Sequence, residues 1–295
     1  MQADPDHAEA WAALGLAQEA LGQWSAAADG LQRAMALGLH SAVLNLSPAV
    51  CRLRLEQPAL ALRSLDQALD ATLAEAWSMR GNLMRETVQP LDAALCSERT
   101  LAHGGDEALY RYCLASVRPG EPVPPRADVE SLFDDYAPDF QHHLLQNLKY
   151  QAHRTLLAPL LAEGRRWSLA FDLGCGSGLC GRLLAPVCAA VDGVDVSRVM
   201  VEQASASGAY RCVAHAKLLP FLAQSDELAD LIVAADVLIF VGALDAVVPA
   251  AVRRLAPGGV LAFSIEQADP GHDLQLRPNL RYAHGQSAIE RLAAS

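Results

Sequence analysis

Two kinds of hydrophobic pattern divide the chain. In the N-terminal part, apolar residues recur every three or four positions, which is the period of an amphipathic helix. From residue 167 onward, short apolar runs alternate with amphipathic stretches, and this alternation predicts strands joined by helices in a parallel α/β sheet. The expected strands are 169–174, 190–197, 209–215, 230–240 and 259–266, and the expected helices among them are 178–188, 198–208 and 244–256.

The helical part contains an internal repeat. Residues 8–37 match the tetratricopeptide spacing through Trp11, Leu14, Gly15, Gly22, Trp24, Ala27, Leu31 and Ala34. A degenerate second copy places Ala61, Leu65 and Ala68 34 residues after the last three of these, and a third contains Trp77, Gly81 and Ala93. In such repeats small residues let paired helices approach, while Trp and Leu fill the groove between neighbours. Residues 106–117 predict a closing helix.

A proline-rich stretch marks the boundary between the two patterns. RPGEPVPPR, residues 118–126, has four prolines in nine residues and predicts a stiff, non-helical connector. We therefore expect a tetratricopeptide-repeat helical domain over 1–117, a linker over 118–128, and a second domain over 129–295 that begins with further helices.

Composition excludes several classes of protein. With 295 residues, 52% of them hydrophobic, the chain can bury one large core or two ordinary ones. No apolar run approaches the roughly 20 residues of a membrane helix, and the acidic start is unlike a secretory signal, so we expect a cytoplasmic protein. A net charge of −11 without a basic face argues against a nucleic-acid partner. The seven cysteines form no C-x-x-C pair and have no His at zinc-finger spacing, which predicts reduced, mostly buried thiols and no metal site.

The stretch LAFDLGCGSGLCGRL carries two overlapping glycine patterns. Gly176, Gly178 and Gly181 fit the dinucleotide fingerprint G-x-G-x-x-G. Asp172, Gly174, Gly176 and Gly178 fit an acid-x-G-x-G-x-G loop, in which the carboxylate meets a cationic amino group and the glycines let the backbone pass close to the ligand. Each pattern implies a different cofactor, and both place it at the carboxyl ends of parallel strands.

Residues farther along the chain distinguish the two patterns. Asp195 lies at the C-terminal end of the second expected strand, two residues before its last residue, where a carboxylate accepts hydrogen bonds from ribose hydroxyls in either case. Asp236, expected at the end of the fourth strand, and Pro257-Gly258-Gly259, expected as a tight turn before the fifth, are not required by dinucleotide domains. They favour the acid-x-G-x-G-x-G interpretation.

On these motifs, residues 167–266 resemble a class I S-adenosylmethionine-dependent methyltransferase, and the whole chain resembles bacterial methyltransferases with N-terminal tetratricopeptide repeats. The resemblance implies S-adenosyl-L-methionine as cofactor, a pre-catalytic helix over 129–150, and a family segment after the fifth strand at 281–285. It implies cofactor contacts at Asp172, Gly174, Cys175, Gly176 and Gly178 for the methionine end, Asp195 for the ribose, Val196, His215 and Ala216 around the adenine, Ala235 and Asp236 beside the methyl group, and Tyr136 in a lid helix.

Catalysis and the acceptor are less constrained by the sequence. Methyl transfer needs mainly alignment and exclusion of water, and a general base only where the acceptor must lose a proton. The candidate bases are His284 and Tyr282, expected in a loop beyond the fifth strand. The strand end A-D-V-L argues against exocyclic amine methylation in nucleic acid, which leaves a small molecule or a protein as acceptor, and the repeats favour a protein partner.

The C-terminal end departs from the expected sheet. A complete class I sheet has seven strands, yet after residue 266 the sequence predicts one helix start and no residues for strands six and seven. The fifth strand would then be an exposed edge. Two alternatives stay open: a repeat scaffold with a degenerate or truncated methyltransferase-like domain, and an NAD(P)-dependent oxidoreductase.

Overall fold

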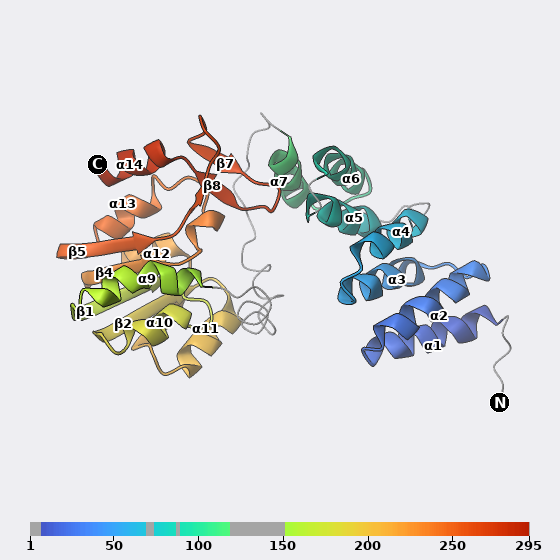
Figure 1. Ribbon diagram of the computed structural model, residues 1–295, viewed down its shortest axis with the longest axis horizontal. Helices are drawn as coiled ribbons and strands as arrows, with labels where there is room; N and C mark the ends of the chain where they lie inside the picture. Colours follow the sequence, from blue (N-terminus) through green and yellow to red (C-terminus); the bar gives the residue numbers. More distant parts are fainter. Residues whose placement is uncertain (1–6, 69–73, 87–88, 119–150, 295) are drawn as a thin grey trace. The chain divides into compact units, whose positions relative to one another are not determined.

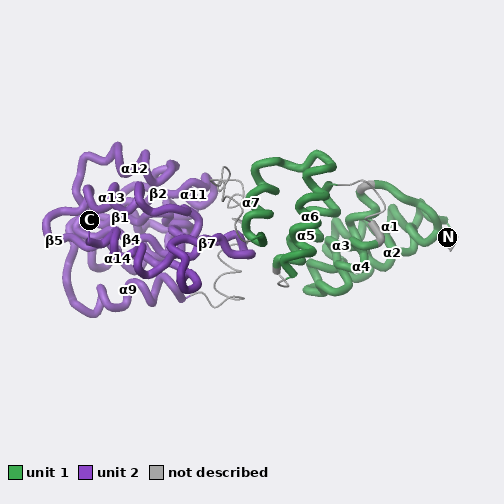
Figure 2. Tube along the Cα trace, turned by 90° about the horizontal axis from the view of Figure 1, so that it is seen from above, with its two compact units in different colours: residues 1–124 green, residues 125–295 purple. Residues whose placement is uncertain are grey.

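The computed structural model describes residues 7–68, 74–86, 89–118 and 151–294 (Figure 1). The chain divides into two compact units, residues 1–124 and 125–295 (Figure 2). Most of the predicted linker (119–128), the predicted pre-catalytic helix and Tyr136 lie outside the described residues.

The N-terminal unit is helical. Its described helices are α1 (Ala8–Ala20), α2 (Trp24–Ala36), α3 (Ala42–Arg54), α4 (Pro58–Ala68), α5 (Ala74–Glu86), α6 (Pro90–Ala102) and α7 (Glu107–Val117). Short connections join successive helices, which therefore pack against one another along the chain. The predicted helical region is confirmed, and so is the closing helix, whose first turn is capped by Asp106 accepting a hydrogen bond from the Leu109 N–H at 2.6 Å.

Small residues stand where two helices meet. A Cβ on Gly15 of α1 would lie 2.7 Å from Cγ of Leu31 on α2, and a Cβ on Gly81 of α5 would lie 3.1 Å from Cβ of Cys96 on α6. Ala27 and Ala61 are fully buried. The first and third hairpins thus approach through equivalent glycines, which is the packing that the repeated small residues predict.

A five-stranded parallel sheet forms the centre of the C-terminal unit. Its strands are β1 (Trp167–Leu173), β2 (Cys188–Asp195), β3 (Cys212–His215), β4 (Ala229–Ala234) and β5 (Leu255–Phe263), in the order β3-β2-β1-β4-β5. All four strand pairs are parallel, as the sequence pattern predicts. The chain order reverses between β1 and β4, so β1 lies at the switch point where this class of sheet binds ligands.

Helices cover both faces of the sheet. They are α9 (Ala152–Ala162), α10 (Leu179–Leu184), α11 (Arg198–Ala206), α12 (Leu218–Gln224) and α13 (Val247–Val252). Along β4, Ile232 and Ala234 pack with α12 and α13, whereas Leu231 and Val233 pack on the opposite side with α9 and α10. This strict alternation buries both faces and explains why the strand is continuously apolar. Helix α12 was not predicted from the apolar pattern.

Two predicted boundaries near the fourth and fifth strands are wrong. The expected strand 230–240 ends at Ala234, and Leu238–Phe240 forms a 3-10 helix, η2. Pro257-Gly258-Gly259 does not precede β5 but lies inside it, as an irregularity between the register pairs Ala229↔Leu255 and Leu231↔Val260. Gly258 has φ +76, which a bulge of this kind accommodates.

The C-terminal residues form more structure than we expected. Beyond β5, the short strands β6 (Glu266–Gln267), β7 (Leu274–Leu276) and β8 (Tyr282–His284) make a separate sheet in the order β6-β8-β7, followed by helix α14 (Gln286–Ala294). These short strands were not predicted from the sequence. Among the described strands, however, none extends the main sheet beyond β5. Within the described part of the chain, no helix is both long and apolar enough to span a membrane.

Candidate functional site

The loop between β1 and α10 is shaped by glycines in the left-handed region. Gly174, Gly176 and Gly178 have φ of +65, +52 and +88, which residues with a Cβ rarely adopt. A Cβ on Gly174 would collide with the side chain of Val237, whereas a Cβ on Gly176 would meet no atom of the described residues within 4 Å. The loop is therefore packed at its start and open beside Gly176.

The carboxylate of Asp195, at the end of β2, holds this loop. Its Oδ2 accepts a hydrogen bond from the Gly176 N–H at 2.9 Å, and its Oδ1 accepts one from the Ser197 N–H at 2.9 Å. Burial raises the pKa of Asp195, while these N–H groups act in the opposite direction by favouring the charged form. The predicted ribose acid and the glycine loop thus form one hydrogen-bonded unit.

The residues predicted around the adenine lie next to Asp195. The Ala216 N–H donates to the Asp195 carbonyl at 3.0 Å, and His215 Nε2 donates to the Val196 carbonyl at 2.8 Å. Because a carbonyl oxygen only accepts, this bond fixes a proton on Nε2. Val196, His215 and Ala216 are thereby brought together at the carboxyl edge of β2 and β3.

Asp172, at the end of β1, has a hydrogen-bond partner that no sequence pattern predicts. Its Oδ2 accepts a hydrogen bond from the Tyr210 hydroxyl at 2.6 Å, and that hydroxyl accepts one from the Gly181 N–H at 3.1 Å. Asp172 is only 1% exposed, and burial raises its pKa to about 7. We expected Tyr210 inside the third strand, but β3 begins at Cys212. A lone Tyr in an apolar run gives no periodic signal for such a contact.

Cysteines near the loop are buried rather than activated. All seven cysteines of the chain are free, and Cys175 and Cys180 are among those that are buried. Burial raises the pKa of both thiols, and the negative charge of Asp172 adds to this effect. A neutral thiol is a poor nucleophile, so the geometry favours packing roles for both.

The segment after β4, residues 235–237, packs against the start of the glycine loop. Asp236 has φ +57; its N–H donates to Ser264 Oγ at 2.7 Å, and that hydroxyl donates to Asp236 Oδ1 at 2.8 Å. Ala235 precedes it and is half-buried. Since Val237 packs on Gly174, the predicted methyl-side residues and the glycine loop lie at the same edge of the sheet.

The two candidate bases lie on a strand, which corrects the expected loop. Tyr282 and His284 are both in β8, two positions apart and therefore on the same face of the small sheet. His284 Nε2 donates to the Gly242 carbonyl at 2.8 Å, and a Cβ on Gly242 would lie 3.3 Å from the Tyr282 ring. Both side chains are 3% exposed. Burial lowers the pKa of His284, which keeps the imidazole neutral.

These features fit an adenosyl cofactor. The backbone beside Gly176 is open, and the Asp195 carboxylate stands next to it. A carboxylate has about four acceptor sites, and the backbone N–H groups of Ser197, Gly176 and Val196 act on that of Asp195, so capacity remains for a ligand hydroxyl.

Comparison with known proteins finds similarity over parts of the chain. Residues 171–261 match a family model described as a methyltransferase domain. No curated protein matches the chain. The described fold is similar to the N-methyltransferase NodS from Bradyrhizobium japonicum WM9 in complex with S-adenosyl-L-homocysteine, with 24% identity over 57% of this chain and 81% of that one and a TM-score of 0.40.

Two further solved structures are each similar to part of the chain. Magnesium protoporphyrin IX methyltransferase (ChlM) from Synechocystis PCC 6803 is 21% identical over 56% of this chain and 86% of that one, with a TM-score of 0.43. YrrB, a TPR protein with an unusual peptide-binding site, is 21% identical over 38% of this chain and 59% of that one, with a TM-score of 0.34. The family match makes residues 171–261 a methyltransferase domain.

Proposed function

We propose that this S-adenosylmethionine-dependent methyltransferase holds its cofactor on the loop between β1 and α10 and transfers the methyl group to a small molecule or a protein. The observation that carries the proposal is the bond between the Asp195 carboxylate and the Gly176 N–H, inside the span that matches the methyltransferase family. This hydrogen bond joins the proposed ribose ligand, Asp195, to the glycine loop proposed for the methionine end.

Each part of the loop has a defined task in this proposal. Asp195 accepts the ribose hydroxyls, and the open backbone beside Gly176 takes the methionine end. Asp172, together with Tyr210, holds the loop from below, because its carboxyl is buried and already hydrogen-bonded. Val196, His215 and Ala216 border the adenine, while Ala235 and Asp236 border the methyl group. Cys175, Gly174 and Gly178 contribute loop backbone.

Methyl transfer requires few further functional groups from the protein. When bound, S-adenosylmethionine supplies a methyl group on a sulfonium that is already activated for displacement. The residues of the chain align the acceptor and exclude water, and a base is needed only where the acceptor carries a proton. His284 and Tyr282 remain the proposed candidates for that base.

For the N-terminal hairpins we propose tetratricopeptide repeats that bind a protein partner. The support is the repeated spacing of small residues together with their packing: Gly15 against Leu31 in the first hairpin, and Gly81 against Cys96 in the third. Stacked hairpins of this kind present an extended surface that suits peptides or helices.

Calorimetric titration with S-adenosylhomocysteine, S-adenosylmethionine and NAD tests the cofactor assignment. We expect the two adenosyl compounds to bind and NAD not to bind. Asp195→Ala should weaken adenosyl binding by roughly tenfold or more, because it removes charge-assisted hydrogen bonds to the ribose.

Asp192→Ala is the matched control. Asp192 lies three residues earlier on β2, and its carboxylate accepts from Arg211 Nε at 2.9 Å, not from the loop. Equal losses in the two variants would mean that Asp195 acts only through general stability. Binding of NAD alone would refute the proposed function.

A further inference from the structure

Asp236 has an unusual backbone conformation for a residue with a side chain. It lies two residues beyond the end of β4, and its φ of +57 is in the left-handed region. Glycine adopts this region freely, whereas aspartate does so only at some cost in free energy. Because glycine would serve the turn better, the aspartate points to a role for its carboxylate.

One hydroxyl group fixes both the backbone and the carboxylate of Asp236. Ser264 Oγ accepts a hydrogen bond from the Asp236 N–H at 2.7 Å and donates one to Asp236 Oδ1 at 2.8 Å. Ser264 is itself placed by the sheet, because its N–H donates to the Ala234 carbonyl at 3.1 Å, directly after the register pair Ala234↔Phe263. The pairing of β4 with β5 therefore holds the carboxylate in one orientation.

The second carboxylate oxygen of Asp236 is available to a ligand. Within the described part of the chain, Oδ2 accepts no hydrogen bond, because both bonds of this side chain and backbone go to Ser264. The residue is half-buried, and Oδ2 is not among the enclosed polar atoms that lack a partner. A ligand can therefore reach this oxygen while Oδ1 stays bound to the serine.

No ion pair among the described residues neutralises Asp236. The ion pairs that the described residues of the C-terminal unit form involve other carboxylates, those of Asp192, Glu227, Glu266, Asp269 and Asp273. The charge of Asp236 also acts on His153 in α9, yet burial and the neighbouring Arg154 lower the pKa of that imidazole, which keeps the ring neutral near neutral pH.

Asp236 lies close to the glycine loop. Val237, the next residue, packs on Gly174 so tightly that a Cβ there would collide with it. Burial raises the pKa of the Cys180 thiol in α10, and the negative charges of Asp172 and Asp236 raise it further. The carboxylate of Asp236 thus acts on the loop that takes the methionine end of the cofactor in the proposed function.

The methyl donor and the product differ in charge at one atom. S-adenosylmethionine carries a positive sulfonium, whereas S-adenosylhomocysteine has a neutral thioether in the same place. A fixed carboxylate nearby favours the donor, since Coulomb attraction acts only on the charged form. Without that carboxylate, the site would distinguish the two compounds by shape alone.

We propose that Asp236 distinguishes the cationic methyl donor from the neutral product, and that Ser264 is its positioning residue. This inference rests on the proposed function, which places S-adenosylmethionine on the glycine loop. On transfer, the electron pair of the acceptor forms the bond to the methyl carbon, and the carbon–sulfur pair returns to sulfur. The positive charge beside Asp236 is then gone, so the carboxylate favours binding of the donor and release of the product.

Calorimetric titration of the full chain with three ligands tests this charge selection without requiring turnover. The ligands are S-adenosylmethionine, S-adenosylhomocysteine and sinefungin, in which a carbon bearing an ammonium group replaces the methylsulfonium. The quantity that decides is the affinity for each cation divided by the affinity for S-adenosylhomocysteine. Asp236→Asn should lower this ratio roughly tenfold, because asparagine keeps the shape and tolerates the left-handed backbone but carries no charge.

Variants of the serine test its positioning role. Ser264→Ala should lower the same ratio by less than Asp236→Asn does, because the carboxylate is still present but no longer held. Ser264→Thr keeps the hydroxyl and should restore the ratio of the unaltered chain. An unaltered ratio in Ser264→Ala would overturn the role of the serine.

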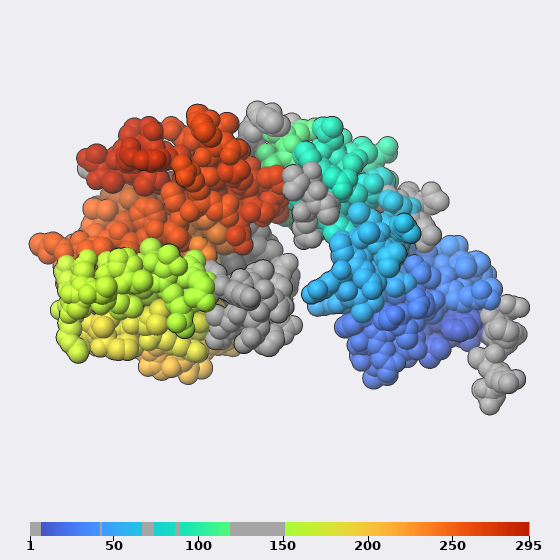
Figure 3. All heavy atoms as spheres, in the orientation of Figure 1, coloured from blue at the N-terminus to red at the C-terminus, as the bar shows by residue number. Residues whose placement is uncertain are grey.

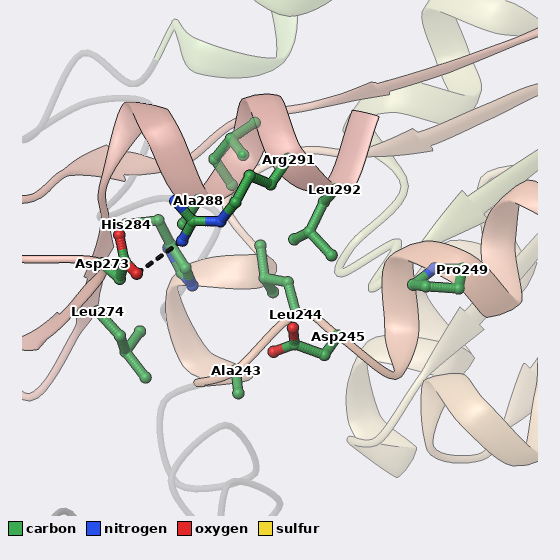
Figure 4. Close-up of a pocket in the computed structure, with 11 residues that line it drawn as sticks. Ala243, Leu244, Asp245, Pro249, Asp273, Leu274, His284, Ala288, Arg291 and Leu292 are labelled. Atoms are coloured by element: carbon green, nitrogen blue, oxygen red, sulfur yellow. Dashed lines mark hydrogen bonds and ion pairs between the residues drawn. The ribbon is translucent and has the colours of Figure 1, made fainter. Parts of the chain in front are cut away.

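Asp245→Asn is the matched control, because it removes the same charge from the same unit. Asp245 is exposed and lines a cavity of about 450 Å³ beside α14, together with Pro249 and Leu292 (Figure 4). On the face shown in Figure 3, α14 and the β7–β8 region lie side by side on the surface of the C-terminal unit. The described lining of this cavity includes no residue of the glycine loop and neither Asp236 nor Ser264. The control should leave the ratio unchanged.

The outcomes separate the inference from the proposed function. An unchanged ratio in Asp236→Asn, with affinities for cations and thioether that stay the same or fall together, would overturn the inference and leave the proposed function standing. A ratio lowered equally by Asp245→Asn would also overturn the inference, since any carboxylate of the unit would then suffice. Failure of the unaltered chain to bind any of the three adenosyl compounds would overturn the proposed function, and the inference with it.

Discussion

At the scale of single residues, Asp172 is a predicted cofactor contact whose carboxyl lies in a strongly altered environment. It is buried at the end of β1, accepts a hydrogen bond from the Tyr210 hydroxyl, and lies near the charge of Asp195. Burial is the main reason that its pKa rises from 3.8 to about 7. Between these two values the folded chain holds a proton that the unfolded chain releases.

This proton makes stability depend on pH in a definite direction. Because the folded state binds more protons, the free energy of unfolding should fall as pH rises, by roughly 2 kcal/mol from this group between about pH 5.5 and about pH 7.5. Asp172→Asn removes the titration and should flatten that part of the profile. Urea unfolding of both proteins at the two pH values measures the difference, and parallel profiles would contradict the pKa shift.

At the scale of elements, helix α10 is held by its contact with Tyr210. A Cβ on Gly181 would collide with the ring and hydroxyl of Tyr210, so α10 can approach the sheet only because that position has no side chain. Gly30 in α2 differs, since a Cβ there would meet its nearest atoms at an ordinary 3.6 Å. Both glycines lie in helices, but only Gly181 lacks the space for a Cβ.

Alanine at these two positions should therefore have opposite effects. Gly181→Ala should destabilise the chain by about 1–3 kcal/mol through overpacking, whereas Gly30→Ala should stabilise it by about 0.5–1 kcal/mol through helix propensity. Thermal unfolding of each variant measures the sign. Replacing Tyr210 by Leu should reduce the cost of Gly181→Ala, and an unchanged cost in that background would exclude the ring contact as its cause.

At the scale of the whole molecule, each unit has its own core. Ala27, Ala28 and Cys51 form a buried cluster within the N-terminal unit, while Phe171 and Ile232 belong to the largest cluster of the C-terminal unit. A unit that buries its own apolar surface can fold alone.

We therefore expect residues 1–124 and 125–295 to fold as separate proteins. Circular dichroism should show that the two spectra add up to that of the full chain. S-adenosylhomocysteine should raise the melting temperature of 125–295 and leave that of 1–124 unchanged, because only a ligand of the folded state stabilises it. An unfolded 125–295 would mean that its core depends on the N-terminal unit.

The sequence alone determined the features that depend on neighbours along the chain. Helical periodicity fixed the N-terminal helices, and alternating runs fixed a parallel sheet of five strands. The glycines at 174, 176 and 178 marked the loop because a left-handed backbone leaves a local signature in residue type. Asp195 is a charged residue after an apolar run, and this local change in residue type marked the end of its strand.

The tertiary structure alone decided which distant residues meet. Tyr210 reaches Asp172 across 38 positions, and His284 reaches Gly242 across 42. No periodic pattern or motif spacing in the sequence predicts either contact. Each contact depends on the order of the strands and on the packing of the side chains beside them. The same cause explains the wrong boundaries: Pro257-Gly258-Gly259 looks like a turn locally, yet pairing with β4 makes it part of a strand.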